Sequence, residues 1–239
     1  METKREEKTA EEEITEKIKE KPKFVCRGEL ALLLAVVINS FGVVLMLYSG
    51  SGISAISSVP FAFSEVLPVL SLGTWTYLFQ GILVISLMIL RRRFVVQYLG
   101  SFVVGFVFGE LLDAHEMWIT VLPTGLGWRI LYFVISYLLI CFGIALSNRC
   151  KLPIIPTDLF PRELSEIIGA GYSKVKIIFD VTCLAVTAIM TLVFLKHLDG
   201  LGIGTILAAF TMGKVVGLMG NQMDQKLQFV SFLSQRQKG

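Results

Sequence analysis

Apolar runs separated by short polar or proline-containing breaks fill the chain between residues 30 and 220. Six of these runs approach or reach the ~20 residues that a helix needs to cross the hydrocarbon core of a bilayer. They cover residues 30–50, 71–90, 94–114, 128–148, 175–195 and 201–220. The pattern predicts an all-α integral membrane protein with six transmembrane helices.

Two of the breaks are too apolar for ordinary loops and too interrupted for membrane spans. They lie at residues 51–70 and 152–170, and each contains the element P-x-x-x-S-E. The fixed positions of this element are Pro60, Ser64, Glu65, Pro161, Ser165 and Glu166. Ser58 and Asp158 resemble helix N-caps followed by proline in the first turn. We therefore predict a short, broken or interfacial helix in each break, over about 60–69 and 160–168.

The two breaks belong to a longer internal similarity. The two P-x-x-x-S-E elements are 101 positions apart, and so are the Phe-Gly pairs that begin at Phe41 and Phe142. The segment TYLFQ, which starts at Thr76, matches KIIFD, which starts at Lys176. GSFVVGFVFG, from Gly100 onward, matches GTILAAFTMG near the C-terminus. These matches occur in the same order in both halves, which indicates an internal duplication.

Each copy contains one span, a break and two further spans. Three spans are an odd number, so the second copy must enter the membrane from the opposite side. The sequence therefore predicts two inverted three-helix repeats, at about 29–114 and 128–220, related by a pseudo-two-fold axis in the membrane plane.

Composition supports the membrane class, and the charges set the orientation. The chain is 54% hydrophobic and 17% charged, with a mean hydropathy of +0.70. With both termini in the cytoplasm, 19 of the 22 Lys and Arg residues fall on the cytoplasmic side, as the positive-inside rule requires. Residues 1–28 are then a charged, solvated tail that we expect to be disordered, residues 29–220 the membrane domain, and residues 221–239 a cytoplasmic C-terminal tail.

Four polar residues interrupt the predicted spans: Gln80, Glu110, Asp180 and Lys214. Charges in hydrocarbon are costly and normally face the bundle interior or a wet cavity. The repeat alignment pairs Gln80 with Asp180 and Glu110 with Lys214. It predicts a neutral–acidic couple in the outer half and an Asp180–Lys214 ion pair in the inner half. The alternative is that Lys214 and Asp180 reach the inner interface separately.

Small residues mark expected helix contacts, and the short helices leave two interpretations open. Gly105 and Gly109, like Gly213 and Gly217, form small-x-x-x-small faces that let helices approach closely. Glu65 and Glu166 either line a site between the halves, as in inverted-repeat transporters, or face water from interfacial helices.

The sequence carries no pattern for catalysis or for a cofactor. It has no phosphate-binding loop, nucleophile elbow or catalytic-triad spacing, and no recurrent His, Cys or acidic spacing that would hold a metal. We expect no enzymatic activity, no metal, no cofactor and no nucleic-acid partner. The expected partners are the lipid bilayer and a small molecule or ion, and a homo-oligomer is left open.

Several of these segments resemble a known group of proteins. The resembling stretches are FGVVLMLYSGSGIS, the break PTDLFPRELSEIIG with YSKVKIIFD after it, and GLGIGTILAAFTMGKVVG. Over about 29–220 the chain is similar to uncharacterised integral membrane proteins of the YczE/YyaS/YitT type. The resemblance implies a bacterial cytoplasmic membrane protein and supplies no substrate.

Two hypotheses for function follow. The first is a small secondary transporter or channel-like protein whose path is lined by Glu65, Glu166 and the four polar residues of the spans. The second is a structural or regulatory membrane protein without a path, in which these groups only hold helices together.

Overall fold

The computed structural model describes residues 24–230, which form eight helices and two short strands. In chain order these are β1 (Phe24–Arg27), α2 (Gly28–Tyr48), α3 (Ser58–Val66), α4 (Leu72–Arg91), α5 (Val96–Ile119), α6 (Leu126–Ser147), α7 (Pro156–Ile168), α8 (Tyr172–Phe194), α9 (Ile203–Lys226) and β2 (Leu227–Val230). The predicted tail up to residue 23 and residues 231–239 lie outside the described residues.

Six of the helices are long and apolar enough to cross a membrane, and they are the six that the sequence predicts. These are α2, α4, α5, α6, α8 and α9, and their ends differ from the predicted ones by up to six residues. The prediction of an all-helical membrane fold is confirmed. The chain is a multi-pass membrane protein.

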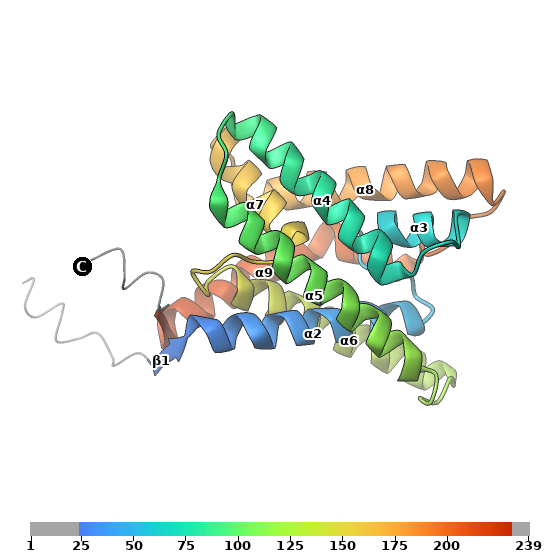
Figure 1. Cartoon of the computed structure of the whole chain (residues 1–239). Helices are drawn as coiled ribbons and strands as arrows, with labels where there is room; N and C mark the ends of the chain where they lie inside the picture. The colour runs from blue at the N-terminus through green and yellow to red at the C-terminus, as the bar shows by residue number, and fades with distance from the viewer. Residues whose placement is uncertain (1–23, 231–239) are drawn as a thin grey trace, which may run out of the picture.

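The spans run between two ends of the bundle. One end carries β1 and β2 and the turn between α4 and α5, and we call it the termini end (Figure 1). The other end carries the connections from α5 to α6 and from α8 to α9, and we call it the loop end (Figure 1). This division locates each polar group along the membrane normal.

Both short helices are re-entrant. Residues 52–62 are buried, although α2 has already reached the loop end, and residues 67–71 are exposed just before α4 begins there. The chain therefore turns back into the bundle, and α3 then runs outward to the loop end. The α7 helix repeats this course in the half nearer the termini end (Figure 1).

The predicted starts of the short helices are wrong. Ser57 and Ile155 occupy the N-cap positions, and neither donates or accepts a side-chain capping bond. The α7 helix begins at Pro156, because proline suits the first helical position, and Pro161 lies in the interior of the helix. Asp158 consequently lies inside the first turn of α7.

Most helix contacts outside the central pair come in matching sets from the two halves, although the contact of α5 with α7 has no counterpart of similar extent between α9 and α3. The first spans of the halves, α2 and α6, pack against each other at the centre. Around them α3 contacts α4 and α8, while α7 contacts α8 and α4. The α2 helix packs on α5 as α6 packs on α9, and α4 packs on α5 as α8 packs on α9.

The α2–α6 crossing is close because it is formed by glycine. A Cβ atom at Gly42 would lie 2.8 Å from Cγ1 of Ile140. A Cβ atom at Gly143 would collide with the side-chain amide of Asn39. The two contacts are equivalent, with the roles of the two halves exchanged. Gly42 and Gly143 are 101 positions apart, and so are Asn39 and Ile140.

The strand pair at the termini end is not foreseen by the sequence. β1 and β2 pair in parallel, with Phe24 opposite Leu227 and Arg27 opposite Val230. Residues 221–226, which were assigned to the C-terminal tail, continue α9. This clasp holds the start of α2 next to the end of α9.

Candidate functional site

A small cavity of about 20 Å³ lies where the beginnings of α3 and α7 meet. This is roughly the volume that one water molecule needs. Its walls come from α2, α5, α6 and α8, from the segments that lead into the two short helices, and from the first turn of α7. The lining residues are Asn39, Val43, Ser54, Ile56, Ser57, Phe108, Ile140, Ile144, Ile155, Thr157, Asp158 and Lys176.

Ten of these twelve residues form five pairs whose members are 101 positions apart. The pairs are Asn39 with Ile140, Val43 with Ile144, Ser54 with Ile155, Ile56 with Thr157, and Ser57 with Asp158. The two halves of the chain therefore face the cavity with equivalent positions and different side chains. One partner in most pairs is polar and the other is apolar.

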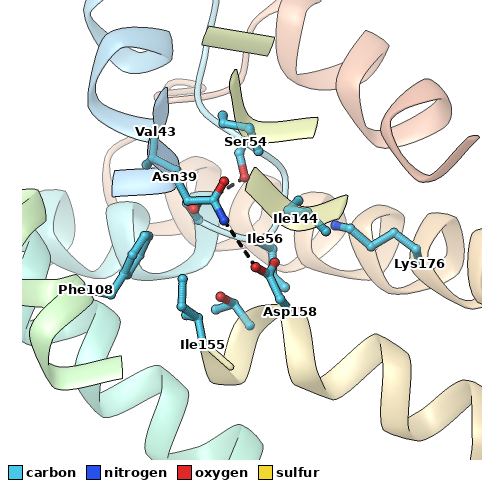
Figure 2. Close-up of a pocket in the computed structure, with 12 residues that line it drawn as sticks. Asn39, Val43, Ser54, Ile56, Phe108, Ile144, Ile155, Asp158 and Lys176 are labelled. Carbon is cyan, nitrogen blue, oxygen red and sulfur yellow. Dashed lines mark hydrogen bonds between the residues drawn. The ribbon is translucent and has the colours of Figure 1, made fainter. Parts of the chain in front are cut away.

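Lys176 enters the cavity from α8 (Figure 2). Lys176 as a whole is 1% exposed, and its Nζ contacts both carboxylate oxygens of Asp180, at 2.8 and 2.9 Å. Asp180, four residues later on the same helix face, is also 1% exposed. A buried ion pair repays its desolvation only with geometry of this quality.

Asp158 faces the same cavity from the first turn of α7 (Figure 2). It is 5% exposed, and Nδ2 of Asn39 donates to its Oδ2 over a long 3.4 Å. Oδ1 of Asn39 is buried and has no hydrogen-bond partner among the described residues. The Asn39 amide and the Asp158 carboxylate thus face the same cavity, and the bond between them leaves the Asn39 acceptor unused.

Hydroxyl groups continue from the cavity toward the loop end. Ser54 and Ser57 share a hydrogen bond of 3.4 Å at the cavity wall. The Ser58 hydroxyl lies 2.8 Å from that of Thr187 on α8, and Thr191 follows one turn further along α8. These residues are buried, so this side of the cavity is polar within an apolar bundle.

Polar atoms also continue toward the termini end. The Ser147 hydroxyl lies near the Asp158 carboxylate, and the Tyr172 hydroxyl lies near Asn148. Although these groups are neighbours, buried Ser147 Oγ, Asn148 Oδ1 and Tyr172 Oη do not reach hydrogen-bond geometry with any group among residues 24–230. An unpaired buried polar group costs about 1–3 kcal/mol, so such groups are usually retained for a reason.

Among the predicted candidates, Gln80 is buried as expected. Its side chain is fully enclosed on α4, and neither its Oε1 nor its Nε2 has a partner among the described residues. It lies against Gly105 of α5, which Pro156 at the start of α7 also approaches. Gln80 therefore borders the entrance to α7 without lining the cavity.

The predicted couples are not formed. Lys214 is exposed on the same stripe of α9 as Phe210 and Leu218, and Glu110 is exposed on α5 beside Phe106 and Val107. Asp180 takes Lys176 as its partner, so the Asp180–Lys214 pair is wrong. The reason is that Gly213 faces Lys176, which turns the next position, 214, away from the bundle.

Glu65 and Glu166 lie at opposite ends of the molecule, away from the cavity. Both are exposed, and Glu166 accepts a bond from Arg91 at 3.2 Å. Partial burial, together with the nearby Asp199 carboxylate, raises the pKa of Glu65. The two carboxylates occupy the outer tips of α3 and α7, which is where interfacial helices would place them.

The remaining P-x-x-x-S-E residues build the short helices. Pro60 and Pro161 are buried in their helices. The Ser64 hydroxyl donates to the Phe61 carbonyl and that of Ser165 to the Arg162 carbonyl, at 2.8 and 2.6 Å. The motif thus marks two helices, α3 and α7, that fold in the same way. Among the described residues, neither of these serines contacts the cavity.

The four candidate packing glycines behave differently from one another. A Cβ at Gly105 would meet Gln80, and one at Gly109 would lie 2.8 Å from the Gly73 carbonyl oxygen. A Cβ at Gly213 would lie 3.2 Å from the Ser173 carbonyl oxygen, whereas Gly217 has open space around it. The backbone is closely approached at Gly105, Gly109 and, more loosely, Gly213, whereas no atom of the described residues approaches Gly217.

Comparison with known proteins identifies a family. The profile of a family of unknown function covers residues 26–221. The chain belongs to the DUF6198 family. No curated protein and no solved structure matches it. The DUF6198 assignment agrees with an uncharacterised family and does not confirm the YczE/YyaS/YitT type.

In this DUF6198 protein the main polar residues of the cavity are mostly ones that the sequence did not single out. Asn39 carries no charge that would mark it within an apolar span. The sequence places Lys176 among the lysines of the cytoplasmic side, and Asp158 resembles a helix cap. The i,i+4 spacing of Lys176 and Asp180 was the signal available for that pair. Among residues 24–230 no cluster of His, Cys, Asp and Glu is placed to hold a metal ion.

Proposed function

We propose that this DUF6198 protein is a small secondary transporter or channel-like protein whose path runs through the central cavity. The observation that carries the proposal is the meeting of two re-entrant helices at a cavity lined by Asp158 and Lys176. Buried ionisable residues within membrane bundles are costly and characteristically mark substrate or ion pathways. Irregular backbone at membrane depth is tolerated where it borders such a cavity.

The proposal includes two inverted repeats. The matching helix contacts, the exchanged Gly42–Ile140 and Gly143–Asn39 contacts, and the five cavity pairs support it. In transporters built this way, substrate sites form between the repeats, where helices are interrupted. From a cavity on the pseudo-two-fold axis, small movements of the helices could open a route to either end of the molecule.

The orientation and the setting are part of the same proposal. We place the termini end in the cytoplasm of a bacterial cell, with the bilayer as solvent for the exposed apolar faces. The exposed Arg92 and Arg93 at that end follow the positive-inside rule. The ligand is a small molecule or ion, no chemical conversion takes place, and association into homo-oligomers is compatible with the account.

The competing function is a structural or regulatory membrane protein without a path. The exposed positions of Glu65, Glu166, Glu110 and Lys214 fit it, because none of these groups lines the central cavity. The central cluster favours transport, since apolar side chains would hold α2, α6 and α8 together at lower cost than Asp158, Lys176 and Asp180.

A ligand screen with matched variants tests the proposal. Purified protein is screened with small solutes and ions, and a ligand at a hundred times its dissociation constant should add about 2.7 kcal/mol of stability. Asp158→Asn or Ser57→Ala should weaken that response, while Lys214→Met on the lipid-facing stripe should keep it. A response that all three variants share would place the ligand elsewhere and contradict a path through the cavity.

A further inference from the structure

The central cavity contains one more carboxylate than the neighbouring cations neutralise. Lys176 is paired with Asp180 at 2.8 Å. Arg162, one turn after Asp158 on α7, contacts Glu163 at 3.5 Å, and Glu163 also accepts from Arg91 at 2.6 Å. Within residues 24–230, Asp158 has no ion-pair partner inside 4.0 Å.

The other neighbours of the first turn of α7 carry no charge. Asn39 comes from α2, Ser147 from α6, Phe108 from α5 and Gln80 from α4. A lone ionised carboxylate in such surroundings costs several kcal/mol, and in practice it takes up a neutralising partner. The question is which partner the cavity can accept.

A proton fits this cavity better than a metal cation. The Lys176 ammonium faces the same space, and the N-terminal ends of α3 and α7, which carry partial positive charge, converge on it. These groups oppose any added positive charge, a proton as much as a metal ion, so the space available decides between the two. The volume of about 20 Å³ also leaves little room for a metal ion with a full set of oxygen ligands. A proton needs only one carboxylate oxygen and one acceptor.

The Asn39 amide can form a hydrogen bond with both the ionised and the protonated form of Asp158. As placed, its Nδ2 donates to the carboxylate across 3.4 Å, while Oδ1 lacks a partner among the described residues. Turning the amide over would present Oδ1 to the O–H of a neutral carboxyl group. The long bond and the unused acceptor are both explained if the carboxyl group alternates between the two states.

We infer that Asp158 is the proton-binding group of the path and that the proton is the coupling ion. A proton from water at one end binds a carboxylate oxygen of Asp158, the new O–H donates to Asn39, and the same O–H bond breaks when the proton leaves to the other end. The Ser54–Ser57 side and the Ser147–Tyr172 side supply polar groups for the two directions. The inference rests on the proposed path.

Infrared spectroscopy of the purified full-length protein, titrated with pH, tests the assignment directly. Wild-type protein should show the carbonyl stretch of a buried protonated carboxyl group, which disappears as the pH is raised. Asp158→Asn should lack that band. Asp224→Asn, a carboxylate paired with Arg149 near the surface, should retain it. If Asp158→Asn does not fold, Asp158→Glu should shift the band.

Thermal stability gives a second reading. Asp158→Asn resembles the neutral state, so its advantage over wild type should grow as the pH rises and Asp158 loses its proton. The same band in Asp158→Asn, or stabilisation of the wild type by sodium chloride but not by choline chloride, would overturn the assignment. If Asp158 binds a proton but the cavity cannot be reached from water, the proton site is supported and the transport path is rejected.

Discussion

Lys176 shows how one side chain decides where a polar cluster forms. Its stem starts near the termini end of α8, yet the ammonium lies inside the bundle because Asp180 receives it one turn later. Long lysine stems often carry their charge out to the interface. Lys214 lies on an exposed stripe that permits this, whereas Lys176 is enclosed on all sides.

The Lys176–Asp180 pair is testable by a double-mutant cycle. Removing one partner of a buried pair leaves the other charge uncompensated, which typically costs about 3–5 kcal/mol. Lys176→Met and Asp180→Asn should each lower thermal stability strongly, and the double variant should recover part of the loss. Lys214→Met should change stability by no more than about 0.5 kcal/mol. Additive losses in the double variant would contradict the pair.

At the residue scale, the sequence predicted Asp180 and Gln80 as buried polar groups and missed their surroundings. A charge inside an apolar run is visible without a structure, because its cost is general. The partner of Asp180 was missed because depth along a helix does not reveal which face a residue occupies. Asn39 and Asp158 were missed because their role depends on the return of α3 and α7 to the bundle centre.

At the scale of elements, the re-entrant helices set the architecture. Each is short, begins beside the central cavity, and ends where the next span starts. The spans were predictable because a bilayer imposes their length. The P-x-x-x-S-E spacing located the short helices, but α7 began earlier than expected because Pro156 was available for its first position.

Glycine substitutions test the helix contacts at this scale. Gly109→Ala would place Cβ 2.8 Å from the Gly73 carbonyl oxygen, so we expect it to lower the free energy of unfolding by about 1–3 kcal/mol. Gly213→Ala should cost less, because its nearest atom is 3.2 Å away. Gly217→Ala meets nothing and should gain up to about 1 kcal/mol from helix propensity. Equal effects at the three positions in a thermal-unfolding series would contradict the α4–α5 and α8–α9 packing.

At the scale of the whole molecule, the proposed path requires two halves that face one cavity from opposite directions. Local matches in the sequence predict the repeat, and the pairs around the cavity support that prediction at residues such as Val43 and Ile144 that carry no motif. The β1–β2 clasp was not predictable, because four-residue strands have too little pattern to detect and their pairing joins the two ends of the chain.

The orientation follows from labelling single cysteines in a variant that lacks the four native ones. A membrane-impermeant thiol reagent added outside intact cells should modify Val121→Cys at the loop end and spare Arg92→Cys at the termini end. Both positions are exposed, so the reagent should modify both of them once the cells are broken. A difference in intact cells therefore reports the side of the membrane. Outside labelling of Arg92→Cys would reverse the orientation.

The most direct test of the central claim is the reactivity of Ser57→Cys, whose side chain lines the cavity at the start of α3. In the same cysteine-free background, an impermeant thiol reagent is applied to right-side-out and to inside-out vesicles, with Leu87→Cys as a buried control away from the cavity. A water-accessible path predicts that Ser57→Cys reacts from at least one side and that bound ligand or a change of pH alters its rate, while Leu87→Cys stays unreactive. If Ser57→Cys is as inert as Leu87→Cys from both sides under every condition, the cavity is sealed and the transport account is contradicted.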